Sequence, residues 1–84
     1  MSKELKTILF LLLTNKHGKD ISKSTITDFT EGSFIYVRDD FNKMMIRDVE
    51  SLVQANILND DSQAELIEFK INLTNYLYAR NIAV

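Results

Sequence analysis

The most regular pattern in the chain is DFNKMMIRDVESLVQA, residues 40–55. Its apolar side chains recur every three or four positions and make one continuous stripe, while the opposite face is polar. The stripe consists of Phe41, Met44, Met45, Val49, Leu52 and Val53. This period predicts an amphipathic α-helix. Asn56 follows it, and because asparagine tolerates the left-handed conformation that closes many helices, we expect the helix to end there.

The segment after this helix permits two structures. Residues 59–63 are polar and predict a turn. Beyond the turn, apolar residues alternate strictly with polar ones at Ile67, Phe69, Ile71 and Leu73. This alternation favours a half-buried strand, followed by a short helix over residues 75–80. A helix is the alternative, because Ser62 and Glu65 fit a capping box and apolar residues recur at helical spacing at Leu66, Phe69, Leu73 and Leu77.

Two short segments precede the central helix. The sequence FIYV at residues 34–37 is aromatic and β-branched, which favours a strand, although one helical turn begun by Ser33 is the alternative. Residues 24–30 predict a short helix capped by Ser24 or Thr25, with Gly32 beyond its end. The sequence therefore predicts a chain that alternates helices with small β segments.

The first helix is predicted over residues 4–14, and a polar turn centred on Gly18 follows it. Its apolar face has the spacing of a buried helix and consists of Leu5, Ile8, Leu9, Leu12 and Leu13. Phe10 and Leu11 flank that face on both sides, so the helix is apolar nearly all round. Such a helix is expected to be buried nearly all round, either inside a monomer or against a second copy of the chain.

Length and composition restrict the classes of function. The 84 residues make one domain, with no cysteine and a net charge of −2. The excess of negative charge lies in residues 51–84, which contain four carboxylate side chains and only two basic ones, Lys70 and Arg80. The apolar run at residues 8–13 is far shorter than the ~20 residues of a membrane span, so we expect no membrane partner and a cytoplasmic location.

Few residues are available for chemistry. His17 is the one histidine, it lies in the polar turn, and we expect it to be a solvated surface side chain. With no cysteine and two glycines, the chain offers neither a nucleophile with its base nor a glycine-rich phosphate loop. We therefore predict that the protein is not an enzyme and holds no cofactor or metal.

The predicted elements follow the order helix, turn, helix, helix, short strand, turn, strand and helix, and this order resembles a winged helix-turn-helix. The closest local match is MIRDVESLVQANIL, residues 45–58, which resembles the end of the recognition helix in bacterial winged-helix repressors. Asn56 stands where those families usually have glycine, and Leu73-Thr74 resembles the end of the second wing strand. The resemblance implies a mainly α fold with a small β wing. It also implies a dimeric, DNA-binding transcriptional regulator of bacterial, phage or plasmid origin.

The resemblance places the candidate DNA contacts on the third predicted helix and around the first turn. They are Asn42, Lys43, Arg47, Lys16, Lys19, Lys23, Ser24 and Thr25. Amide and basic side chains read base edges and bind phosphates. The dimer contact is expected on the first and last helices, at Phe10, Leu11, Tyr76, Leu77 and Tyr78.

A protein-interaction module that binds no nucleic acid is the alternative function. The acidic second half of the chain and the apolar and aromatic side chains of the first and last helices, Phe10, Leu11, Tyr76, Leu77 and Tyr78, favour it. Two departures also weaken the resemblance to a helix-turn-helix. Residues 31–39 separate the second and third predicted helices, whereas that motif has a turn of 3–4 residues. Asp39 and Asp40 also place negative charge at the start of the helix that would approach DNA phosphates.

Overall fold

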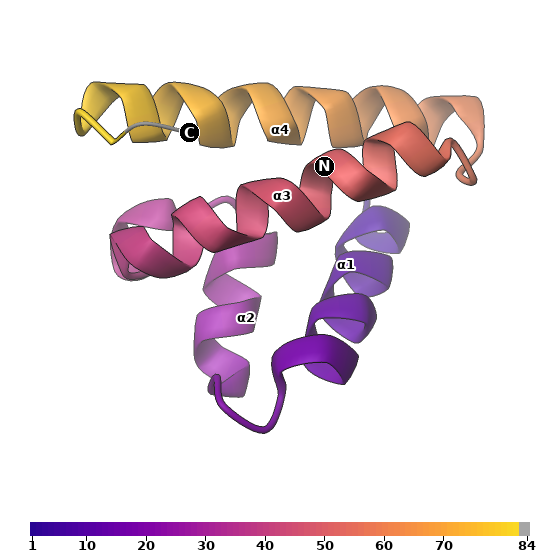
Figure 1. Ribbon diagram of the computed structural model, residues 1–84. Helices are drawn as coiled ribbons and strands as arrows, with labels where there is room; N and C mark the ends of the chain where they lie inside the picture. The colour runs from indigo at the N-terminus through magenta and orange to yellow at the C-terminus, as the bar shows by residue number, and fades with distance from the viewer. Residues whose placement is uncertain (83–84) are drawn as a thin grey trace.

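The computed structural model describes residues 1–82, which form four α-helices and one 3₁₀ turn. In chain order these elements are α1 (Lys3–His17), α2 (Lys23–Thr30), the 3₁₀ turn η1 (Phe34–Tyr36), α3 (Asp39–Ala55) and α4 (Asp60–Ala79). Figure 1 shows α4 running along the top of the molecule above α3, with α1 and α2 descending below them and joined by the turn at the bottom. The fold therefore has α3 and α4 on one side and a diverging pair of shorter helices on the other.

Side-chain caps set where three of the helices begin. The Ser2 hydroxyl oxygen accepts a hydrogen bond from the backbone N–H of Leu5, and the Ser22 hydroxyl oxygen accepts one from the backbone N–H of Thr25. Each donor–acceptor distance is 3.2 Å. Asn59 caps α4 in the same way, so α2 and α4 both begin earlier than the caps predicted at Ser24 and Ser62. Such a cap satisfies an amide that has no partner within the helix.

The predicted β wing is wrong. No strand occurs within residues 1–82, and residues 60–79 form the single helix α4. Its inner face is the helical alternative recognised in the sequence, with Leu66, Phe69, Leu73 and Leu77 buried. The alternation that favoured a strand arises because Ile67 and Ile71 lie on the opposite, outer face, where 42% and 52% of their surface is exposed.

For residues 34–37 the strand alternative is wrong and the helical-turn alternative is correct, because residues 34–36 form the 3₁₀ turn η1. Phe34 points into the core, whereas Ile35 and Tyr36 are exposed by 71% and 77%. One anchored residue followed by two exposed ones fits a single helical turn, which needs no partner strand. The amphipathic helix predicted over residues 40–55 is confirmed as α3, and Asn56 closes it in the left-handed conformation with φ of 51°.

Aromatic rings join the helices at the centre of the core. The ring of Phe29 on α2 lies 5.4 Å from that of Phe69 on α4 and 5.8 Å from that of Phe41 on α3, both edge to face. Phe34 of η1 packs against the same Phe69 ring at 5.5 Å. Edge-to-face aromatic pairs add to the stabilisation that burial provides. The cluster therefore connects α2, η1, α3 and α4.

The first helix is less buried than its composition predicts. Leu5, Leu9 and Leu13 contact the core along one line, but Leu11 and Leu12 are exposed by 61% and 47%. Only a part of the apolar circumference of α1 is covered by this chain.

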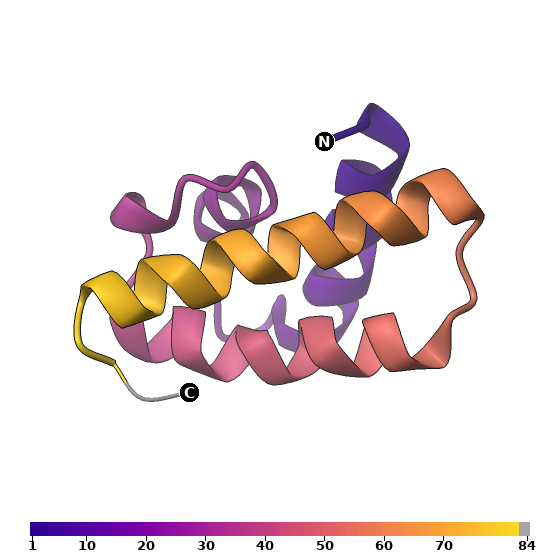
Figure 2. The same cartoon turned by 90° about the horizontal axis from the view of Figure 1, so that it is seen from above.

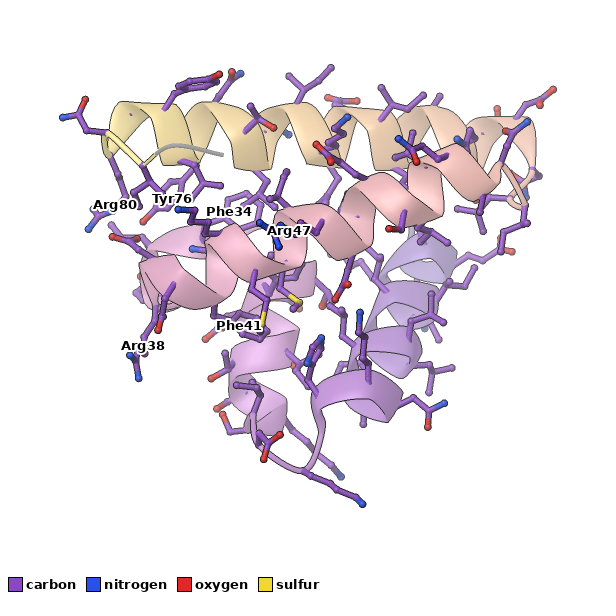
Figure 3. The ribbon with its side chains drawn as sticks, viewed as in Figure 1. Phe34, Arg38, Phe41, Arg47, Tyr76 and Arg80 are labelled. Carbon is purple, nitrogen blue, oxygen red and sulfur yellow. The ribbon has the colours of Figure 1, made fainter. Side chains whose placement is uncertain are left out.

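Two polar links fasten the ends of α4 to the rest of the chain. The Ser2 backbone nitrogen donates to Glu65 at 2.6 Å, and this hydrogen bond lowers the pKa of that carboxyl group. At the other end, Arg80 donates from Nε to both carboxylate oxygens of Asp39, at 2.9 and 3.0 Å. Figure 3 shows Arg80 beside Tyr76, where its guanidinium lies 5.7 Å from the ring centre.

Candidate functional site

An apolar groove lies between α1 and the second half of α3. Its volume is about 480 Å³. Its lining is Leu9, Leu12, Leu13, Asn15, Lys16, Asp48, Val49, Ser51, Leu52 and Ala55. Most of this lining is aliphatic, and we call it the α1–α3 groove.

The groove lies at the edge of the core between α1 and α3. Leu9, Leu13 and Val49 are buried and belong to the continuous core, so the groove floor is the outer edge of that core. Leu12 and Leu52 form its sides and are only partly covered. Water therefore contacts aliphatic side chains here that a packed neighbour would normally cover.

One end of the groove is closed by a polar cluster of three residues. The Nζ atom of Lys16 donates to Oδ1 of Asp48, and Nε2 of His17 lies 3.0 Å from the other carboxylate oxygen. These contacts link the last turn of α1 to the middle of α3. The His17 ring is only 16% exposed and meets the Phe41 ring edge to face, so the prediction of a solvated surface histidine is wrong.

The charge of Asp48 is stabilised in this cluster. Partial burial alone would raise the pKa of Asp48, but the hydrogen bonds from Lys16 and His17 outweigh it, and the pKa lies below its ordinary value. Asp48 therefore stays ionised at the rim of an otherwise apolar groove. Asp48 and His17 are 31 residues apart, so no local sequence pattern could assign them to a shared site.

The structure places the predicted DNA-reading residue Asn42 inside the molecule. Its side chain is fully buried and donates to the backbone carbonyl oxygens of Phe34 and Val37, at 3.1 and 3.4 Å. An amide held in this way is not available to a base edge, so its assignment as a DNA contact is wrong. Asn42 lies on the inner side of α3, where its amide is held against the backbone of η1 and Val37.

Lys43 and Arg47 lie on the exposed side of α3, one helical turn apart. Neither has a carboxylate within 4.0 Å in the part of the chain described, whereas Arg38 pairs with Asp40 at 3.0 Å. Figure 3 shows Arg47 in the middle of α3 and Arg38 just before that helix. Arg38 thus neutralises one of the two aspartates at the start of α3, and Arg80 pairs with the other.

The other candidate phosphate contacts gather at the bottom turn and the start of α2. Lys19, Lys23 and Ser24 are exposed there, and Thr25 is half-buried with its hydroxyl 2.9 Å from that of Ser22. Lys16 belongs to the polar cluster at the groove instead. Figure 1 shows this turn at the far end of α2 from η1, so these residues and the exposed face of α3 form two separate groups.

The residues predicted for a dimer contact divide between core and surface. Leu77 is fully buried in the core of its own chain, and Tyr76 is half-buried with its ring centre 5.7 Å from that of Phe34. Phe10 also packs against the core. Leu11 and Tyr78 are exposed, by 61% and 63%, so these two alone of the five are well placed to meet another molecule.

Residues 1–82 contain no group of three or more histidine, aspartate or glutamate side chains arranged to hold a metal ion. In the same residues, no helix combines the length and the apolar character needed to cross a bilayer.

No family model, curated protein or solved structure that we compared with this chain matches it. The α1–α3 groove and the exposed side chains around it are therefore the features that bear on function.

Proposed function

We propose that this protein is a protein-interaction module that binds an amphipathic helix of a partner in the α1–α3 groove. The observation that carries the proposal is the row of aliphatic side chains left uncovered between two helices, directly on the core. A helix that inserts apolar residues spaced three or four apart is the ligand such grooves bind in other proteins.

The chemistry of the groove selects the ligand. Its sides, Leu12 and Leu52, are aliphatic, so the partner helix should present leucine, isoleucine or methionine. Fully burying one such side chain stabilises a complex by roughly 1.5–3 kcal/mol, and the partly exposed Leu12 offers about half of that.

The test uses displayed peptides in which leucine or isoleucine is fixed at positions i, i+3, i+4 and i+7. Peptides selected on the purified protein should shift the backbone amide resonances of Leu12 and Leu52. Leu12→Glu should weaken their binding at least tenfold, because it places a charge at the groove side.

Leu11→Glu is the matched control, since it introduces the same charge at the neighbouring leucine, which does not line the groove. Circular dichroism should show both variants folded, because both side chains are substantially exposed. A selection without binders, or equal binding by the two variants, would contradict the proposal.

DNA binding is the second candidate, and one observation favours it. Lys43 and Arg47 present two unpaired cations on one face of α3, and Lys19 and Lys23 add positive charge at the start of α2. The test is fluorescence anisotropy with a labelled random duplex at about 50 and about 200 mM salt, because phosphate contacts weaken steeply as salt rises. Absence of binding at the lower salt concentration would exclude this candidate.

A further inference from the structure

The outer face of α4 carries a second apolar stripe, separate from the α1–α3 groove. The stripe consists of Ala64, Ile67, Ile71, Thr74 and Tyr78. The intervals between them are three, four, three and four residues, which is the spacing of the contact line in a two-helix coiled coil. Figures 1 and 2 show no other element of the chain above this face.

The large side chains of the stripe are exposed to solvent. Ile67, Ile71 and Tyr78 are 42%, 52% and 63% exposed. Thr74 donates its hydroxyl to the backbone carbonyl of Lys70 at 2.8 Å, so covering it would leave no unpaired donor. The outer face of α4 therefore has the composition of a contact surface over nearly the whole helix.

We propose that α4 pairs with α4 of a second copy of this chain, in antiparallel orientation about a two-fold axis at Ile71. With Ile71 on the axis, Ala64 lies seven residues before it and Tyr78 seven residues after it. Each small Ala64 then faces the large Tyr78 of the other copy, which lets the two helices approach closely along the stripe. A surface that complements itself in this way is the requirement for a two-fold dimer.

Charge favours the same orientation. Asp60 continues the stripe at its N-terminal end, and parallel pairing would place the two Asp60 carboxylates against each other. In antiparallel pairing each Asp60 lies beyond Tyr78 of the other copy, so the two carboxylates are far apart. This orientation also places the N-terminal end of each helix dipole beside the C-terminal end of the other. Lys70 and Glu68 flank the stripe, and Lys70 is already matched by Glu50 of its own chain at 3.7 Å.

The size of the contact predicts a weak dimer. The fifteen residues from Ala64 to Tyr78 extend ~21 Å along the helix. Two such faces bury an area near the lower limit of ~1,000 Å² for a specific interface. We therefore expect a dissociation constant in the micromolar range or above, and a monomer in dilute solution.

Sedimentation equilibrium of the full chain between about 5 and about 500 µM tests the pairing, across the affinity range expected for a small interface. The weight-average mass should rise from that of a monomer toward that of a dimer. Ile71→Glu should keep the monomer mass throughout, because it places two carboxylates on the axis. Asn72→Glu adds the same charge to the same helix away from the stripe, and should behave like the unchanged chain.

A constant monomer mass for the unchanged chain, or unaltered association of Ile71→Glu, would overturn the proposal. Orientation is tested by disulfide formation, since the chain has no cysteine. A mixture of Ala64→Cys and Tyr78→Cys should form the mixed disulfide under mild oxidation. A disulfide dimer of Ala64→Cys alone, formed more readily than the mixed one, would show parallel pairing and overturn the antiparallel dimer.

Discussion

The side-chain amide nitrogen of Asn42 donates a hydrogen bond over 3.1 Å to the backbone carbonyl oxygen of Phe34, inside the core. A longer contact of 3.4 Å reaches the carbonyl of Val37. Phe34 begins η1 and Val37 follows it, so one residue of α3 holds both ends of the turn that leads into its own helix. This connection fixes η1 over the aromatic cluster and turns Asn42 away from the surface.

Asn42→Ala should therefore lower the free energy of unfolding by about 1–3 kcal/mol, because it opens a cavity and leaves the buried Val37 carbonyl oxygen without this donor, although the Phe34 carbonyl oxygen still accepts from the Val37 N–H. Lys43→Ala, at the adjacent exposed position, should change it by less than about 0.5 kcal/mol. Urea denaturation followed by circular dichroism measures both. Equal midpoints for the two variants would show that the Asn42 amide adds nothing to stability.

The helices that the sequence predicts well are those with one apolar face. In α3 the apolar positions occupy one side, so the period of 3.6 residues is clear and the end at Asn56 follows from local chemistry. In α4, Ile67 and Ile71 place apolar residues on the outer face, and together with Phe69 and Leu73 they imitate the alternation of a strand. Periodicity along a chain cannot separate a helix with two apolar faces from a half-buried strand.

The candidate groove could not be predicted either, and the reason is different. Its sides come from α1 and α3, and its polar end joins Lys16 to Asp48 across 32 residues of sequence. Sequence pattern identifies which side chains are apolar, but the position of α1 relative to α3 depends on how all the helices pack around the core. The same limit explains why Leu12, predicted to be buried, is instead on the exposed side of a groove.

Asn56 provides a test of backbone conformation. Its φ of 51° is a conformation that costs a β-branched residue roughly 1–2 kcal/mol. Asn56→Val should therefore lower the melting temperature, whereas Asn56→Gly should leave it unchanged or raise it, since glycine adopts positive φ freely. Thermal unfolding of the two variants gives the comparison. A valine variant as stable as the glycine variant would mean that α3 ends differently in solution.

The polar cluster at the groove predicts a dependence of stability on pH. Because the folded-state pKa of Asp48 lies below its ordinary value of 3.8, the carboxylate binds protons less readily in the fold than in the unfolded chain. Its contribution is complete well above that ordinary value and is lost as the pH falls through the folded-state pKa. The advantage of the unchanged chain over Asp48→Asn should therefore shrink as the pH falls from about 5 to about 2.

Lys16→Met tests whether the hydrogen bond from Lys16 is a cause of the lowered pKa of Asp48. Removal of the ammonium group takes away one of the two hydrogen bonds that favour the carboxylate, so the pKa of Asp48 should move upward. A carboxyl resonance followed by NMR during a pH titration measures it directly. A pKa unchanged by Lys16→Met would assign the whole shift to His17.

Charge reversal at Arg47 distinguishes direct contact between α3 and DNA from electrostatic attraction of DNA to the protein as a whole. If α3 meets DNA, Arg47→Glu should weaken binding to a labelled duplex at least tenfold and make the dependence on salt shallower, because fewer phosphates are neutralised. Lys3→Glu changes the net charge by the same amount at an exposed position on α1, and should reduce the affinity by no more than two- to threefold. Equal losses in the two variants would mean that only net charge matters and that α3 is not the contact surface. A duplex that neither the unchanged chain nor the variants bind would leave the α1–α3 groove as the functional surface of the monomer.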